Sequence, residues 1–139
     1  MTIRILLADN HAGMRASMRT MIDRQTDMAV VAGAHDGQGA MRLAGEFKPD
    51  VVVMDINMAD LKGADAARQI AADKTGVRFL ALSMHANLQF VDEMIKAGAG
   101  GYLLKDQAFE ELVRAIRTVA DGRIYLCPGI EKKDATESG

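Results

Sequence analysis

Two acids, a hydroxyl and an amine stand out in this sequence because each closes a run of apolar residues. Asp9 and Asp55 end two such runs. Ser83 and Lys105 end two more. Paired carboxylates suit a hard cation such as Mg²⁺, and a lysine and a hydroxyl can hold phosphoryl oxygens, so together these groups fit phosphoryl transfer. Each residue alone is better explained as the polar start of a loop, and Asp55 alone as a cap.

Apolar periodicity predicts the elements that would position these residues. Aliphatic runs predict five strands, and amphipathic stretches between and after them predict five helices. The predicted strands cover residues 3–9, 28–32, 51–55, 77–83 and 102–104, and the predicted helices lie at about 14–25, 37–47, 63–72, 88–95 and 107–120. Alternating strands and helices predict an α/β fold, a five-stranded parallel sheet with helices on both faces, because the crossovers are right-handed.

A parallel sheet would bring the four polar residues to one place. The carboxyl ends of its strands lie along a single edge, where open α/β sheets bind their ligands. Asp9, Asp55, Ser83 and Lys105 each end a different predicted strand. Loop polarity explains any one of them, but it does not explain the convergence of all four. Asp55, which closes an unbroken apolar run, is then a candidate nucleophile.

Length, charge and cysteine content narrow the class of protein. The chain has 139 residues, which suits one domain, and its single cysteine cannot form an intramolecular disulfide. A net charge of -2 lacks the basic excess of nucleic-acid binders, so we expect no direct nucleic-acid binding. The apolar stretch at 5–8 is too short for a signal peptide or membrane span, so we expect a soluble, cytoplasmic protein without membrane contact. Residues 1–128 would form the domain, and 129–139 a polar tail or the start of a linker.

Four short segments resemble the receiver domains of two-component response regulators. They are LLADNH at 6–11, DINM at 55–58, LSMH at 82–85 and GYLLKD at 101–106. Together they are similar to the branch that usually carries a C-terminal helix-turn-helix domain and acts in transcription regulation. The resemblance implies a flavodoxin-like (βα)5 receiver fold over about residues 3–128.

The resemblance implies a phosphorylation switch rather than an enzyme. Asp55 would be the phosphoacceptor, taking a phosphoryl group from a histidine kinase or a phosphotransfer protein, with Ser83 and Lys105 as its catalytic partners. Ser83 and Tyr102 would then shift and remodel an interaction surface. Family resemblance also makes a homodimer plausible.

The resemblance further implies a Mg²⁺ site with a departure from the family pattern. Its expected ligands are Asp9, Asn10, Asp55 and Asn57. Asn10 stands where the family usually has a second acid, so the site is less negative and we expect weaker Mg²⁺ binding. Ala59 stands where the family usually has proline, which loosens the loop after Asp55.

Several polar residues allow more than one interpretation. Asn57 and His85 occupy positions that border the phosphoryl group in receivers and tune its hydrolysis. His11, His35 and His85 could suggest a transition-metal site, but they follow three different strands without short ligand spacing, which disfavours one. The methionines of the first helix recur at helical spacing and predict core packing.

Two other functions stay open beside the phosphoaccepting receiver. The first is a receiver-like interaction module with weakened or no dependence on phosphorylation, which Asn10 and Ala59 would favour. The second is a Mg²⁺-dependent phosphohydrolase that uses Asp55 as its nucleophile. The hydrolase is the weakest of the three, because Asn57 stands where such an enzyme would normally have a second acid.

Overall fold

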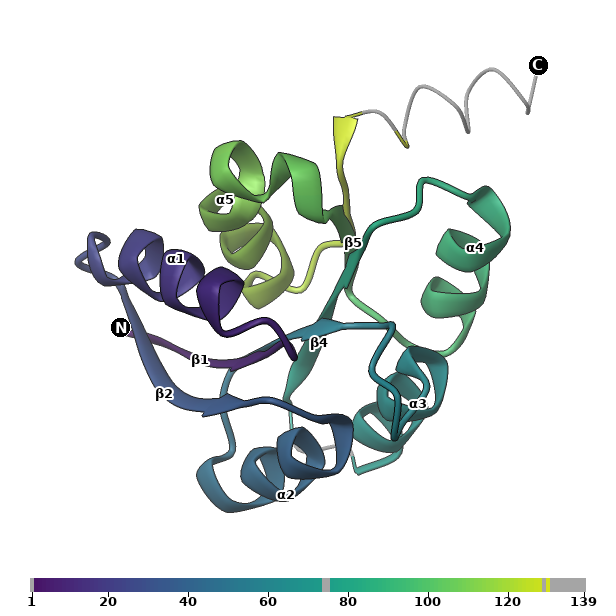
Figure 1. The fold of residues 1–139 in the computed structure, drawn as a ribbon, viewed down its shortest axis with the longest axis horizontal. Helices are drawn as coiled ribbons and strands as arrows, with labels where there is room; N and C mark the ends of the chain where they lie inside the picture. Colours follow the sequence, from purple (N-terminus) through teal and green to yellow (C-terminus); the bar gives the residue numbers. More distant parts are fainter. Residues whose placement is uncertain (1, 74–75, 129, 131–139) are drawn as a thin grey trace.

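The computed structural model describes residues 2–73, 76–128 and 130, and it contains one parallel sheet. The strand order is β2-β1-β3-β4-β5-β6 (Figure 1). The strands are β1 Ile3–Ala8, β2 Met28–Ala34, β3 Val51–Asp55, β4 Arg78–Ser83, β5 Gly101–Leu104 and β6 Tyr125–Leu126. The predicted parallel α/β sheet is confirmed, with one strand more than expected.

Helices cover both faces of this sheet, as predicted. They are α1 Ala12–Asp23, α2 Gly37–Phe47, α3 Gly63–Asp73, α4 Leu88–Lys96 and α5 Ala108–Ala120, and a 3-10 turn, Lys105–Gln107, precedes α5. α1 and α5 pack together on one face, while α2, α3 and α4 lie side by side on the other (Figure 1). Within the described part of the chain, no helix has the length and apolar character needed to cross a bilayer.

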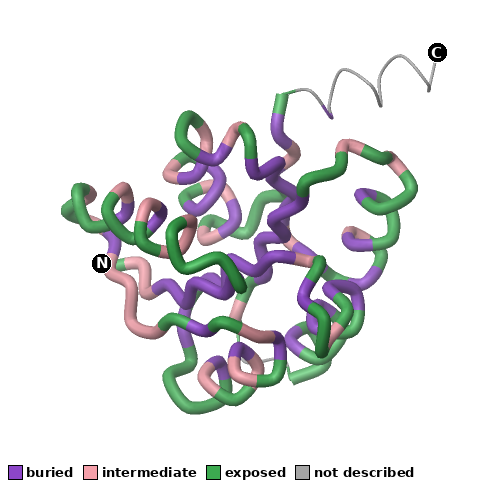
Figure 2. The backbone as a smooth tube through the Cα atoms, viewed as in Figure 1, coloured by how far each residue is buried: buried purple, intermediate pink, exposed green. Residues whose placement is uncertain are grey.

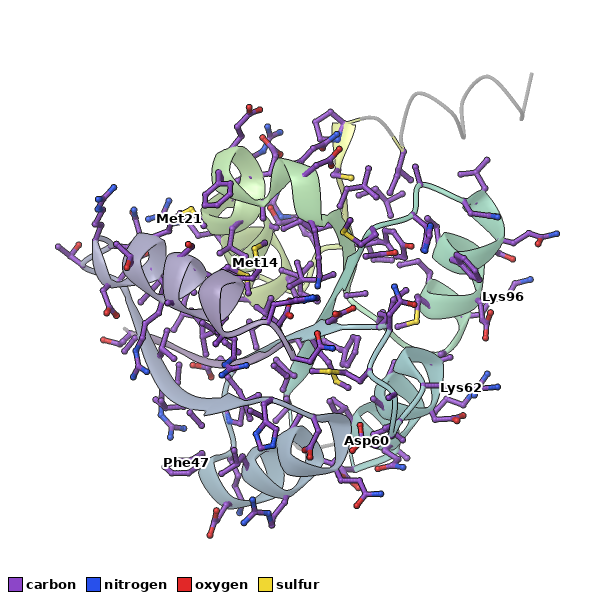
Figure 3. All side chains as sticks on the ribbon, viewed as in Figure 1. Met14, Met21, Phe47, Asp60, Lys62 and Lys96 are labelled. Carbon is purple, nitrogen blue, oxygen red and sulfur yellow. The ribbon has the colours of Figure 1, made fainter. Side chains whose placement is uncertain are left out.

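The core lies between the sheet and its two helical layers (Figure 2). Every residue of Val51–Asp55 is buried, because both faces of this central strand are covered. This is the physical reason for the unbroken apolar run in the sequence. Met18 is fully buried, and Met14 and Met21 pack against the core from the side of α1 that faces α5 (Figure 3). The prediction of core packing for these methionines is confirmed.

The sixth strand was not predicted, because two residues are too few to show a periodic pattern. It pairs in parallel with β5 beside Gly101 and Tyr102, and so extends the sheet at its edge. Further along the chain, Ile130 is fully buried, although it falls within the predicted polar tail. The rest of residues 129–139 lies outside the described residues.

Candidate functional site

The strand order places two acids at the point where the sheet changes its winding direction. β1 and β3 are neighbours, while their following strands lie on opposite sides, and ligands bind outside the carboxyl ends at such a point. Asp9 directly follows β1, and Asp55 is the last residue of β3. Their neighbours on the same edge are Ser83, the last residue of β4, and Lys105, which follows β5. The four strand-end residues therefore share one edge, as predicted.

These four residues are also set apart by their burial. Among the described residues, the buried polar and charged side chains are Asp9, Asp55, Ser83 and Lys105, with exposures of 0%, 3%, 0% and 8%. Burying a charge is costly unless it is paired. The stability of a small domain does not require three charged groups and a hydroxyl to be buried together at one edge of its sheet. Their burial therefore indicates a function.

Lys105 pairs with both acids. Its Nζ lies 2.7 Å from Asp55 Oδ2 and 2.8 Å from Asp9 Oδ2. Burial would lower the pKa of the Lys105 ammonium, but its close contacts with the Asp55 and Asp9 carboxylates and the attraction of their charges outweigh burial and raise that pKa above its ordinary value. Lys105 therefore stays protonated and holds the two carboxylates together.

The remaining carboxylate oxygens differ in their partners. Asp55 Oδ1 accepts a hydrogen bond of 2.9 Å from the backbone N–H of Asn57. Asp9 Oδ1 accepts one of 2.8 Å from the backbone N–H of His11. Asp9 Oδ2 is different, because its contact with Lys105 is an ion pair without hydrogen-bond geometry, and within the described chain it accepts no hydrogen bond. A buried carboxylate oxygen in this state has a lone pair free for a cation.

Ser83 and Tyr102 meet at the backbone of His85. The Ser83 hydroxyl accepts a hydrogen bond of 3.0 Å from the His85 N–H, and the Tyr102 phenol donates one of 2.8 Å to the His85 carbonyl. Tyr102 is fully buried, and burial raises the pKa of its phenol. The His85 side chain is exposed, and its ring lies 5.9 Å from that of Phe90. The loop after β4 is thus tied to β5 through main-chain atoms of one residue.

The other predicted ligands, Asn10 and Asn57, lie at the rim of the site. Asn10 is exposed in the bend after β1, and Asn57 is exposed in the turn after β3. The loop that carries Asn57 is held at its far end by Asp60, whose carboxylate accepts hydrogen bonds of 2.8 and 2.9 Å from the first two backbone N–H groups of α2. This attachment restrains the loop in which Ala59 replaces the expected proline.

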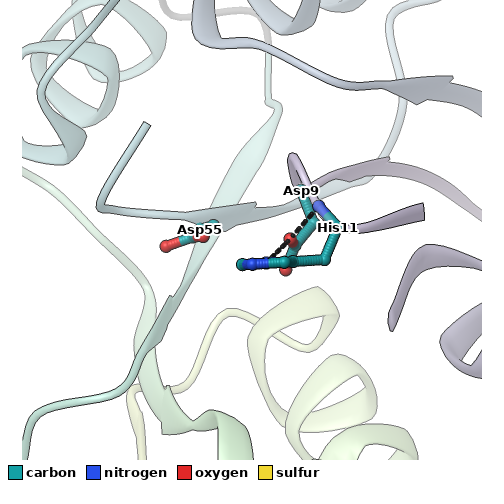
Figure 4. A group of neighbouring side chains, drawn as sticks. All are labelled: Asp9, His11 and Asp55. Carbon is teal, nitrogen blue, oxygen red and sulfur yellow. Dashed lines mark hydrogen bonds and ion pairs between the residues drawn. The ribbon is translucent and has the colours of Figure 1, made fainter. Parts of the chain in front are cut away.

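Sequence reasoning missed two residues that contact Asp9. The Arg15 guanidinium donates a hydrogen bond to the Asp9 backbone carbonyl. His11 Nδ1 lies 3.1 Å from Asp9 Oδ1, and Asp9, His11 and Asp55 offer ligand atoms that all lie within 4.8 Å of one another (Figure 4). The available signal was the position of His11 two residues after a strand-end acid. The expectation that the three histidines form no common metal site stays a prediction, while His35 contacts Asp36 at 3.8 Å.

Comparison with known proteins identifies the family. The family model of the response regulator receiver domain matches residues 5–117. The chain belongs to this family. As a receiver domain it is 34% identical over 128 residues to the transcriptional regulatory protein DegU of Brevibacillus brevis, covering 92% of this chain and 54% of the relative. It is 42% identical over 120 residues to the uncharacterized transcriptional regulatory protein YxjL of Bacillus subtilis (strain 168), covering 86% and 55%.

A solved structure extends the comparison to the fold. A two-component response regulator of the LuxR family from Aurantimonas sp. SI85-9A1 superposes with a TM-score of 0.93 at 38% identity, covering 99% of both chains. The receiver spans about half the length of the two curated relatives. The predicted family and receiver fold are confirmed, and the chain is a receiver domain of two-component response regulators. The phosphorylation-independent interaction module is not favoured by these matches.

Proposed function

We propose that this receiver works as a phosphorylation switch in which Asp55 accepts a phosphoryl group from a histidine kinase or a phosphotransfer protein. The observation that carries the proposal is the contact of 2.7 Å between Lys105 Nζ and Asp55 Oδ2 in a buried site. A buried ammonium beside a carboxylate can stabilise the extra negative charge that a phosphoryl group brings. Ser83, on the neighbouring strand, supplies a hydroxyl that can donate to a further phosphoryl oxygen.

The transfer uses the Asp55 carboxylate as an ionised nucleophile. One of its oxygens attacks the phosphorus of a phosphohistidine, an O–P bond forms, and the N–P bond breaks. The bonding electrons stay on the leaving imidazole nitrogen, which takes up a proton from solvent. The Lys105 ammonium, which pairs with a carboxylate oxygen before transfer, would then pair with a phosphoryl oxygen.

The residues present fit a divalent cation such as Mg²⁺. Asp9 and Asp55 offer carboxylate oxygens, and the buried Asp9 Oδ2 accepts no hydrogen bond from any described residue. The exposed Asn10 and Asn57 lie at the rim. When bound, Mg²⁺ would neutralise charge between Asp55 and an incoming phosphoryl group. Asp9, Asn10, Asp55 and Asn57 are therefore proposed as the metal-binding residues, with water completing the coordination.

Ser83 and Tyr102 are proposed as the switch residues. Both hold the backbone of His85 in the described state, and a Ser83 hydroxyl that turns to a phosphoryl group gives up its bond to the His85 N–H. The loop after β4 and the Tyr102 phenol can then rearrange together, which changes the surface beside α4 and β5. For a longer protein that contains this receiver, we propose regulation of transcription through that surface. A homodimer, a cytoplasmic location and the lack of direct nucleic-acid contact stay predictions.

Incubation with acetyl phosphate and Mg²⁺, followed by intact-mass measurement, tests the proposal. We expect the native chain to gain the mass of one phosphoryl group, Asp55→Asn to gain none, and the exposed control Asp121→Asn to behave as native. No gain on the native chain would overturn the proposal in favour of a phosphorylation-independent module. Continuous release of phosphate from phosphate esters, lost in Asp55→Asn, would instead favour the hydrolase.

A further inference from the structure

We propose that His11 is a metal ligand and that it makes this site prefer a first-row transition ion, such as Mn²⁺, over Mg²⁺. This inference rests on the proposed function, because it concerns the ion that the phosphoacceptor site would use. It goes beyond that function by assigning a nitrogen donor to a site otherwise made of oxygens. The proposed ligand is a divalent ion that accepts both imidazole and carboxylate.

The geometry brings the imidazole to the two carboxylates. One ligand atom each from Asp9, His11 and Asp55 lies within 4.8 Å of the others, a spacing that one ion can bridge. Figure 4 shows the His11 ring reaching from its loop past the Asp9 carboxylate toward Asp55. Asp9 contributes a buried oxygen, Oδ2, that accepts no hydrogen bond from the described residues. The carboxylates are thus oriented before any ion enters.

Among the described residues, the His11 ring makes one polar contact, with Asp9 Oδ1 at 3.1 Å. Its ring is 69% exposed, so it adds little to the core. The loop is already held by the His11 backbone N–H, which donates to Asp9 Oδ1 at 2.8 Å. The imidazole is therefore free to exchange its 3.1 Å contact with Asp9 for a bond to an ion.

Asn10 offers the site a neutral amide rather than a carboxylate, and this increases the share of His11 in the choice of metal. Mg²⁺ binds oxygen ligands, and a site with one carboxylate fewer attracts it less. The affinity of a nitrogen donor for first-row divalent ions rises from Mn²⁺ toward the later metals, whereas Mg²⁺ keeps to oxygen ligands. The neutral amide of Asn10 disfavours Mg²⁺, and the imidazole of His11 favours a transition ion. Both residues therefore shift the preference of the site away from Mg²⁺.

Calorimetric titration of protein without a histidine tag, with MnCl₂ or MgCl₂ and no phosphodonor, tests the inference. We expect His11→Ala to weaken Mn²⁺ binding by about tenfold or more, since loss of even an outer-shell partner typically has that effect, and to change Mg²⁺ binding far less. His35→Ala is the matched control, because this imidazole is 80% exposed and also lies beside an acid, Asp36. It should alter neither affinity. The inference would be overturned if His11→Ala weakened the binding of Mn²⁺ and Mg²⁺ equally, or if it weakened neither.

Electron spin-echo spectroscopy of bound Mn²⁺ gives a second readout. We expect a ¹⁴N coupling from a directly bound imidazole in the native protein and in His35→Ala, and its loss in His11→Ala. Asp55→Asn should remove the bound Mn²⁺ itself, and retention of that ion would overturn the assignment to this site. The phosphorylation test on native protein is separate, so a missing ¹⁴N coupling with normal phosphorylation defeats this inference alone. A coupling that depends on His11, without phosphorylation, defeats the proposed function alone.

Discussion

The Lys105 ammonium lies 2.7 Å from Asp55 Oδ2, and the same nitrogen lies 2.8 Å from Asp9 Oδ2. One buried cation thus faces two buried anions, and this group carries a net negative charge under the cover of the sheet edge. The imbalance makes the site receptive to a further cation. It also makes the site dependent on the lysine, because among the described residues the only other basic side chain that contacts these carboxylates is the exposed His11 imidazole, beside Asp9.

Removal of the lysine charge should therefore destabilise the fold. Lys105→Met leaves two carboxylates buried without a cation, and breaking a buried ion pair typically costs about 3–5 kcal/mol. Urea denaturation followed by circular dichroism measures the change. The control is Lys96→Met, which removes an exposed pair with Asp92 and should change stability little. Equal stability of the Lys105→Met variant and the native protein would contradict the described pairing.

Restoration of the missing acid should lower the Mg²⁺ requirement for phosphorylation. Asn10 is exposed at the rim, so Asn10→Asp adds a charge without disturbing the core. We expect half-saturation at about tenfold less Mg²⁺, because a third carboxylate strengthens attraction of a hard divalent cation. A magnesium titration of acetyl-phosphate labelling measures it, and identical half-saturation for both proteins would refute the role given to position 10.

Asp60 should give the fold a stability that depends on pH. Hydrogen bonds from the backbone N–H groups of Gln38 and Gly37 lower the pKa of this carboxyl below its ordinary 3.8. A lowered pKa in the folded state stabilises the fold above the ordinary pKa, and this contribution is lost as the pH falls through the lowered value. Asp60→Asn should therefore be less stable than native protein near neutral pH, with the difference shrinking in acid. Denaturation series at several pH values measure this, and a constant difference would count against it.

Substitution of His85 should change the lifetime of the phosphorylated state. The His85 backbone holds Ser83 and Tyr102, while its side chain is exposed beside the site. His85→Ala keeps the backbone contacts and removes only the ring, so any effect reports on the side chain. We expect a change of several-fold in the rate of phosphoryl loss, followed by intact mass over time. An unchanged lifetime would remove His85 from the tuning residues.

Gly63, at the start of α3, should tolerate no side chain. A Cβ there would lie 2.4 Å from the Cβ of Ile56 and 2.9 Å from its Cα, so the loop after β3 would have to move. We expect Gly63→Ala to cost about 1–3 kcal/mol, as overpacking does. Gly45→Ala in α2 is the matched control, since its Cβ would meet no atom of the described residues within 4 Å and alanine favours a helix interior. Thermal denaturation of both variants separates the two effects.

The fold was predictable for those elements whose burial produces a recognisable pattern of apolar residues in the sequence. The buried strand β3 appears as an unbroken apolar run because helices cover both faces of the sheet. The predicted second strand stopped at residue 32, whereas β2 continues to Ala34, since Gly33 interrupts the apolar pattern. β6 could not be predicted from the sequence. This two-residue strand forms because it pairs with β5 in the folded domain, not because its residues have a local preference for a strand.

The site was predictable in part for a related reason. Strand periodicity fixes which residue ends a strand, and the common edge of a parallel sheet then brings Asp9, Asp55, Ser83 and Lys105 together. Loops carry no such periodicity. The direction of the His11 ring and the reach of Asp60 to the start of α2 depend on how separate loops pack, which the sequence pattern does not encode.

The pairing of β6 with β5 has a mechanical consequence. Leu126 is in register with Tyr102, and the Cys127 N–H donates a hydrogen bond of 3.3 Å to the Tyr102 carbonyl. The phenol of the same tyrosine is attached to the loop after β4. The Tyr102 side chain therefore contacts the loop after β4, and its backbone pairs with β6. Through these contacts, a displacement of Tyr102 would be transmitted from the loop after β4 to β6.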